Sequence, residues 1–173
     1  MRRRRSMSSL AGAMMLVLAF SSSAIAAPNH RTVQILDNCG PSFNEFLGEG
    51  ACSRPGGMSV DTFFKLFGIG GSPSWRFSPG QVKVASGGTV TAINRGGEFH
   101  SFTEVADFGG GCIDEINAAL GLSAVPECAG GFGIIGATGV GPGGSLSTGP
   151  LSTGAHKFMC LIHPWQRTTV TVD

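Results

Sequence analysis

The sequence predicts an all-β fold of the sandwich or barrel type, and two observations carry this prediction. Short runs alternate between apolar and polar side chains and are rich in β-branched residues, as half-buried strands are. Turn signals such as Pro79-Gly80 and Gly87-Gly88 separate these runs. Several short strands joined by frequent turns are typical of a sandwich or barrel. The expected strands lie at residues 32–35, 81–84, 89–93 and 169–172.

Two short helical insertions are expected to interrupt the strands. In each of them apolar residues recur on one helix face: Val60, Phe63, Phe64 and Phe67 in the first, and Ile113, Ile116 and Leu120 in the second. We interpret the Phe stripe as core packing, because this is far more common than a ligand pocket. Residues 130–154 are rich in Gly, Ser, Thr and Pro, so we expect a solvated loop there, with one strand around residues 145–147.

Residues 1–26 have the layout of a secretory signal peptide. A positive run from Arg2 to Arg5 precedes the apolar stretch 10–20, and Ala24-Ile25-Ala26, with a small residue on each side of Ile25, offers a cleavage site. An uncleaved anchor would share the apolar stretch, but this one is short and ends in a processing site. We therefore expect export to the periplasm or the extracellular space, by a route that the sequence leaves open and that includes twin-arginine export. Residues 27–173 then form a single domain, large enough for a proper core.

The charge balance excludes one class of partner. Cleavage after residue 26 removes four of the 12 Lys and Arg residues and none of the 11 Asp and Glu residues, which leaves a formal charge of −3. No basic cluster remains that could bind nucleic acid. No second apolar segment is long enough to span a membrane. We expect the exported domain to be a monomer without a membrane span.

The chain has five cysteines, an odd number for an exported protein. Pairing neighbours, Cys39 with Cys52 and Cys112 with Cys128, is the simplest of three connectivities for these four and leaves Cys160 over. Each crosslink of this loop size stabilises the fold by about 3 kcal/mol in the chain-entropy model. The odd cysteine could also be a buried free thiol or form an intermolecular bridge. Its sequence context favours metal ligation.

Cys160 and His163 lie three residues apart, and His100 supplies a second imidazole from far upstream. Two His and one Cys with a weak axial donor, here Gln166, are the ligand pattern of a blue-copper electron-transfer site. A closed zinc site would need a fourth ligand, and only His30 and His156 are left for it.

Two other kinds of chemistry are weaker alternatives for Cys160. The segment Cys160-Leu161-Ile162-His163 lacks the second cysteine of a c-type haem attachment motif. A catalytic Cys–His pair is also conceivable, but no oxyanion or substrate motif accompanies it. A copper oxidase or nitrite reductase would need further His-rich copper sites. We therefore do not expect an enzyme.

The segment 158–166, Phe-Met-Cys-Leu-Ile-His-Pro-Trp-Gln, resembles the C-terminal ligand loop of cupredoxins, the plastocyanin/azurin superfamily. Its spacing is that of the short amicyanin loop, with Gln166 in the Met position, as in stellacyanin-like proteins. Residues 89–102 resemble the strand, Asn-containing turn and first His ligand of the same family, and residues 77–84 resemble a strand that leads into its core. The resemblance covers roughly residues 75–106 and 154–173.

The resemblance implies a Greek-key β-sandwich or barrel holding one type 1 copper ion. His100, Cys160 and His163 would be the equatorial ligands, and Gln166 the axial one. The Ser101 backbone N–H would hold the thiolate sulfur. A glutamine oxygen is a harder donor than a thioether, so it should favour Cu(II) and lower the reduction potential. The alternative for Gln166 is that it turns outward.

The implied function is single-electron transfer by an exported carrier. The family resemblance implies that the His163 edge lies at the surface and that a redox partner docks near His163, Pro164 and Trp165. The alternative is a protein without redox function, either a copper-binding carrier or a cupredoxin scaffold kept for protein contacts.

Overall fold

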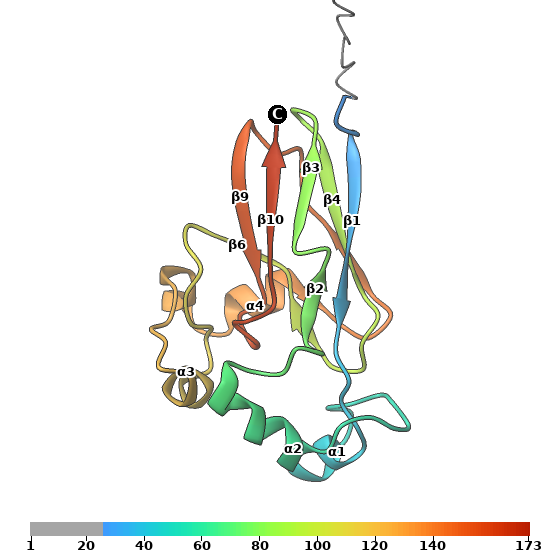
Figure 1. The fold of residues 1–173 in the computed structure, drawn as a ribbon, viewed down its shortest axis with the longest axis vertical. Helices are drawn as coiled ribbons and strands as arrows, with labels where there is room; N and C mark the ends of the chain where they lie inside the picture. The colour runs from blue at the N-terminus through green and yellow to red at the C-terminus, as the bar shows by residue number, and fades with distance from the viewer. Residues whose placement is uncertain (1–25) are drawn as a thin grey trace, which may run out of the picture.

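The computed structural model describes residues 26–173 and shows two four-stranded sheets packed as a sandwich (Figure 1). Residues 1–25 of the predicted signal peptide lie outside the described residues. One sheet has the order β2-β1-β4-β8, formed by Arg76–Ser78, His30–Leu36, Thr89–Asn94 and Ser145–Ser147. The other has the order β3-β10-β9-β6, formed by Gln81–Val84, Arg167–Val172, Gly154–Met159 and Thr103–Val105. A short pair joins β5 (His100–Ser101) to β7 (Gly139–Val140).

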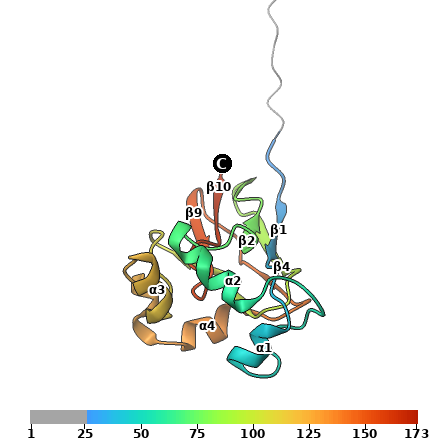
Figure 2. The same cartoon turned by 60° about the horizontal axis from the view of Figure 1, so that its bottom comes forward.

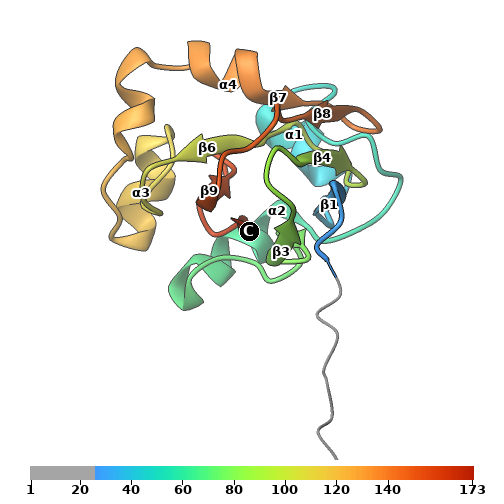
Figure 3. The same ribbon diagram turned by 90° about the horizontal axis from the view of Figure 1, so that it is seen from above.

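The core lies between the two sheets, where the alternating residues of each strand meet. In β4 and β10 every second side chain is buried, as the sequence pattern predicts. Both sheets are mixed, because β1 pairs parallel with β4 and β3 pairs parallel with β10. Figure 3 looks along the strands and shows the two layers. The β-sandwich predicted from the sequence is confirmed.

Both predicted helices are present. The first is α2 (Val60–Lys65), which continues as the 3-10 helix η1 (Leu66–Ile69), and the second is α3 (Asp114–Leu120). The Ser59 hydroxyl caps α2 by accepting from the Thr62 N–H at 3.3 Å. No helix of residues 26–173 is long and apolar enough to cross a membrane.

Three further helical segments were not predicted: α1 (Ser42–Leu47), η2 (Pro126–Gly130) and α4 (Gly133–Thr138). The last of these lies in the stretch 130–154, where a loop was expected, so that part of the prediction was wrong. The strand expected around residues 145–147 is confirmed as β8. Glycine disfavours a helix, but Ile135 of α4 is buried against Val105, Met159 and Leu161. This tertiary packing overrides the local propensity.

Disulfides join Cys39 to Cys52 and Cys112 to Cys128, and Cys160 is the free cysteine of the described residues. The neighbour pairing is therefore confirmed. The first disulfide brackets α1, and the second brackets α3. Figures 1 and 2 show that the helices gather at one end of the sandwich, with α2 lying across that end. The helical insertions therefore lie at the end of the sandwich where β9 ends and the loop with Cys160 and His163 begins.

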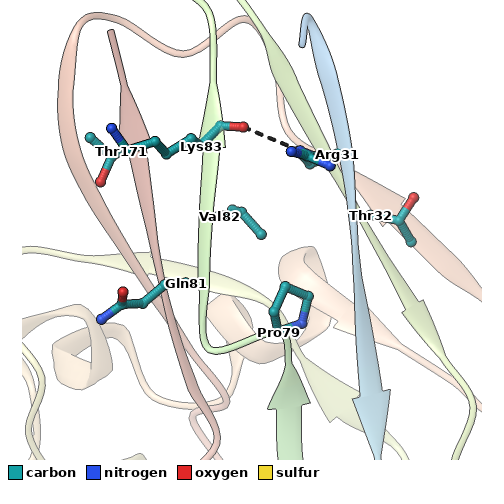
Figure 4. A pocket seen from close by; sticks show the side chains of 7 residues that line it. All are labelled: Arg31, Thr32, Pro79, Gln81, Val82, Lys83 and Thr171. Carbon is teal, nitrogen blue, oxygen red and sulfur yellow. Dashed lines mark hydrogen bonds between the residues drawn. The ribbon is translucent and has the colours of Figure 1, made fainter. Parts of the chain in front are cut away.

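A separate hollow lies between β1 and β3 at one edge of the sandwich (Figure 4). Arg31 spans it, because its Nε donates to the Lys83 carbonyl at 3.4 Å. Pro79 and Val82 supply apolar parts of the lining. None of the predicted metal-site residues lines this hollow.

Candidate metal centre

The loop between β9 and β10 carries three of the predicted site residues. It closes on itself, because the Cys160 N–H donates to the Gln166 carbonyl at 3.1 Å and the Gln166 N–H donates to the His163 carbonyl at 2.9 Å. Cys160, His163 and Gln166 are all buried. The two paired strands thus fix a thiol and an imidazole on one short connection.

His100 reaches this loop from β5, where it pairs with Val140 of β7. Its Nδ1 lies 3.2 Å from Nδ1 of His163 and 3.8 Å from Sγ of Cys160. The same sulfur lies 3.8 Å from Nδ1 of His163. The structure therefore brings the three predicted equatorial ligands together as a triangle of buried donor atoms.

This triangle fits one metal ion. First-row metals such as zinc bind imidazole nitrogen at about 2.0 Å and thiolate sulfur at about 2.3 Å, so donors 3.2–3.8 Å apart can share an ion between them. Within residues 26–173, Cys160 belongs to one group of metal-binding side chains, the one that it forms with His100 and His163. A soft thiolate with two imidazoles suits copper, whereas a closed zinc site lacks its fourth His, Cys or carboxylate ligand in this group.

Gln166 has a buried side-chain oxygen that lacks a hydrogen-bond partner within residues 26–173. The side chain is fully buried, and its Nε2 donates to the Leu36 carbonyl at 3.0 Å. Its Oε1 has no hydrogen-bond partner among the described residues. An unsatisfied buried acceptor costs about 1–3 kcal/mol, so an oxygen kept in this state is one that a ligand could use. The alternative in which Gln166 turns outward does not hold.

The surroundings of Cys160 favour the thiolate. The Ser101 N–H donates to Sγ at 3.4 Å, as the resemblance implies. Burial alone would raise the pKa of Cys160, but hydrogen bonds and charges from His100 and His163 outweigh it and hold that pKa well below its usual value. Burial likewise opposes the charge on His100, yet Asp37 and Cys160 raise its pKa to about 9. Both shifts favour a thiolate beside a protonated imidazole in the metal-free site.

Two buried carboxylates that the sequence reasoning missed face the ligand imidazoles. Asp37 accepts from Nε2 of His100 at 2.9 Å. Glu98 has an oxygen 3.8 Å from Nε2 of His163 and accepts a hydrogen bond from the Trp75 indole. Burial raises the pKa of Glu98 despite the nearby His163. Neither residue stands at a recognisable ligand spacing in the sequence.

His163 does not lie at the surface, so the expectation of a surface-exposed edge was wrong. It is only 5% exposed, and three aromatic rings cover it: Phe63, Trp75 and Trp165, with centroids 6.1, 6.5 and 5.5 Å from the imidazole. We call these three rings the aromatic cap. Pro164 is buried, and Trp165 is half-buried with its indole N–H donating to the Ser72 carbonyl at 3.0 Å. Of the predicted Phe stripe, Phe63 is core and Phe67 packs against it, but Phe64 is 40% exposed, so the prediction of core packing was wrong for that ring.

A hollow of about 510 Å³ leads from the surface to His163. Glu98 and His163 line it together with apolar side chains of α1, α2 and α3. Four of its lining residues, Phe46, Leu47, Phe64 and Phe99, are 40–61% exposed. The hollow therefore connects the imidazole to an apolar rim.

The remaining histidines lie apart from this centre. His30 Nδ1 is 3.0 Å from the Thr89 hydroxyl, and His156 Nδ1 is 2.6 Å from a Glu104 carboxylate oxygen. Neither joins a group that could hold a metal ion within the described residues.

No protein-family model matches the chain, and no curated protein matches it either. Solved structures do match. A purple cupredoxin from Nitrosopumilus maritimus is 14% identical, with a TM-score of 0.42, over 83% of this chain and 99% of that chain. A mutant fern plastocyanin is 14% identical, with a TM-score of 0.41, over 82% of this chain and 99% of that one. A mutant amicyanin in its Cu(I) form is 20% identical, with a TM-score of 0.36, over 57% and 73%.

At identities and TM-scores this low, the fold assignment rests on the sheets and loops described above. Two four-stranded sheets pack face to face. The short β5-β7 pair brings His100 beside the loop that carries Cys160 and His163. These are the features that the resemblance predicted. The chain has a cupredoxin-like fold.

Proposed function

We propose that this protein is a type 1 copper protein that transfers single electrons. His100, Cys160 and His163 would hold one copper ion, with the Gln166 oxygen as the axial donor. The observation that carries this proposal is the buried triangle of donors, 3.2–3.8 Å apart. Copper bound there supplies a one-electron couple between its two oxidation states.

The residues around the ligands suit such a carrier. The Ser101 hydroxyl accepts from the Leu161 N–H at 2.8 Å, and the Ser101 N–H donates to the Cys160 sulfur. These bonds join the two ligand-bearing segments directly. All three ligand side chains are buried, which limits the access of water to the site. A site held in this way changes little in geometry when its charge changes.

We propose that a redox partner approaches through the hollow over His163. Pro164 and Trp165 do not offer a flat docking patch, because Pro164 is buried and Trp165 packs on Phe63 and Phe67. The exposed phenyl rings at the rim of the hollow are the apolar surface nearest to His163.

The second candidate function is copper binding without electron exchange. The burial of His163 under the aromatic cap favours it, because the cap lengthens the path between copper and a partner. One measurement distinguishes the two candidates. The copper of an electron carrier exchanges electrons rapidly with soluble oxidants and reductants, and that of a copper-binding carrier without redox function does not.

We further propose that residues 1–26 are a cleaved export signal and that residues 27–173 act as a monomer in the periplasm or outside the cell. Two disulfides in a chain of this size support this proposal, because such bonds persist in oxidising compartments.

Adding Cu(II) to the purified, exported protein tests the assignment. We expect an intense charge-transfer colour in the visible range that Cys160→Ala abolishes and His156→Ala, at a histidine outside the site, retains. A colourless wild-type protein would contradict the proposal.

Gln166→Met should raise the reduction potential, since a thioether stabilises Cu(II) less than an amide oxygen. An unchanged potential would remove Gln166 from the ligand set.

A further inference from the structure

Asp37 is a buried charge that the ligand set does not explain. It follows the last residue of β1, and its side chain is completely shielded from solvent. Buried carboxylates are rare unless they are paired and hydrogen-bonded. Four N–H groups meet this one: Cys39 N at 3.2 Å, Gly97 N at 3.0 Å, Glu98 N at 3.1 Å and His100 Nε2 at 2.9 Å.

These four donors keep the carboxylate ionised. Hydrogen bonds from N–H groups to both oxygens stabilise the charged form of a carboxylate. Both carboxylate oxygens are occupied, two donors to each. Asp37, Glu98 and His100 are close enough together to hold a metal ion of their own, but each Asp37 oxygen already accepts two hydrogen bonds, so we interpret Asp37 as a fixed anion.

The fold is shaped to let the His100 segment approach this carboxylate. A Cβ atom at Gly96 would lie 1.7 Å from Oδ2 of Asp37, and one at Gly97 would lie 2.7 Å from the sulfur of Cys39. Only glycine leaves room at these two positions. The Ser53 N–H also donates to the Gly97 carbonyl at 2.9 Å. This hydrogen bond ties the residue that follows Cys52 of the first disulfide to the chain just before His100.

We propose that Asp37 is the positioning residue of this metal site: it holds the His100 ring through Nε2–H, directs Nδ1 at Cys160 and His163, and lowers the reduction potential of the metal. This inference rests on the copper function proposed above. A neutral imidazole carries one N–H, and an acceptor at Nε2 leaves Nδ1 free to ligate. A carboxylate behind a metal-bound imidazole also makes the ring a stronger donor.

The direction of the effect on the potential follows from charge. Asp37 adds a negative charge beside the site in a poorly screened interior, and this charge stabilises the more positive oxidation state of the metal. His163 has no equal support, because Glu98 stands 3.8 Å from its Nε2, beyond a hydrogen bond. The His100 ring is thus held by a hydrogen bond to Asp37, whereas the His163 ring lines the hollow.

The test is Asp37→Asn, which keeps the size of the side chain and removes its charge. We expect copper affinity to fall 10–100-fold, which is the usual effect of losing the residue that accepts a hydrogen bond from a metal-bound histidine. We expect the preference for the oxidised metal to fall at least tenfold, which for a one-electron couple is a rise of about 59 mV in potential. Glu104→Gln is the matched control, because it removes the charge from a His–carboxylate pair outside the site, with His156 at 2.6 Å. It should change neither quantity.

A measurement on the wild-type protein covers the case in which Asp37→Asn does not fold. In the Cu(I)-loaded protein, the His100 Nε2 proton should give a downfield NMR signal that exchanges slowly with water. A rapidly exchanging proton would overturn the proposal, as would an Asp37→Asn variant that folds with the wild-type potential. A wild-type protein that binds no copper would instead refute the copper function itself.

Discussion

Phe63 is the central ring of the aromatic cap, and replacing it by alanine tests the packing over the metal site. The side chain is 4% exposed, and its ring centroid lies 4.8 Å from Trp75, 5.1 Å from Phe67 and 5.4 Å from Phe43. Removing a phenyl ring from such a site costs about 3–5 kcal/mol, through lost transfer free energy and the cavity left behind. A domain of ordinary stability, about 5–15 kcal/mol, would stay folded but be measurably weaker.

Urea unfolding of the metal-free protein measures this loss as a lower midpoint at an unchanged m-value. Phe132→Ala is the control, because that ring is 64% exposed and its loss should change the free energy of unfolding by no more than about 0.5 kcal/mol. In the copper-loaded protein, Phe63→Ala should also speed reduction by a small soluble reductant, since it uncovers His163. A loss of stability below about 1 kcal/mol would refute the tight packing inferred for the cap.

Two further predictions concern protons and disulfides. In the metal-free protein the Cys160 thiolate should be visible by ultraviolet absorption between pH 6.5 and 9, below the ordinary thiol pKa of 9.0, and absorption that appears only near pH 9 would contradict it. In this window the folded protein binds one proton on His100 and the unfolded chain binds one on Cys160, so this pair should make the free energy of unfolding independent of pH. Below pH 6.5 the unfolded chain also protonates His100, so the free energy of unfolding should fall. Replacing Cys39 and Cys52 by serine should cost about 2–4 kcal/mol in urea unfolding, and a loss within about 0.5 kcal/mol would refute a structural role for that disulfide.

Much of the site could be predicted because its signals are local. The spacing of Cys160, His163 and Gln166 is set by one short turn, and the odd cysteine count together with neighbour pairing left Cys160 as the free thiol. Four of the ten strands in the described residues, β1, β3, β4 and β10, were visible because each buries one face, which leaves a period of two in the sequence. Joining His100 to Cys160 needed more than local pattern, and the resemblance supplied it.

The missed features all depend on contacts between distant segments. Asp37 meets His100 only because β1 and the turn at Gly96 converge, and a single aspartate after a strand carries no such information. The Gly96-Gly97 pair was the one available signal. The burial of His163 depends on the angle at which α2 crosses the end of the sandwich, and helical spacing predicts a face but not its target.

The two disulfides also decide which thiol a metal meets. A reduced chain offers five cysteine sulfurs, any of which can bind a soft ion such as copper. Closing Cys39–Cys52 and Cys112–Cys128 withdraws four of them and leaves only Cys160. Metal that arrives after oxidation thus has a single thiol to choose, whereas metal that arrives earlier could be trapped at the wrong sulfur. Under the copper function proposed above, oxidation before loading is therefore the order that leaves the metal a single thiol.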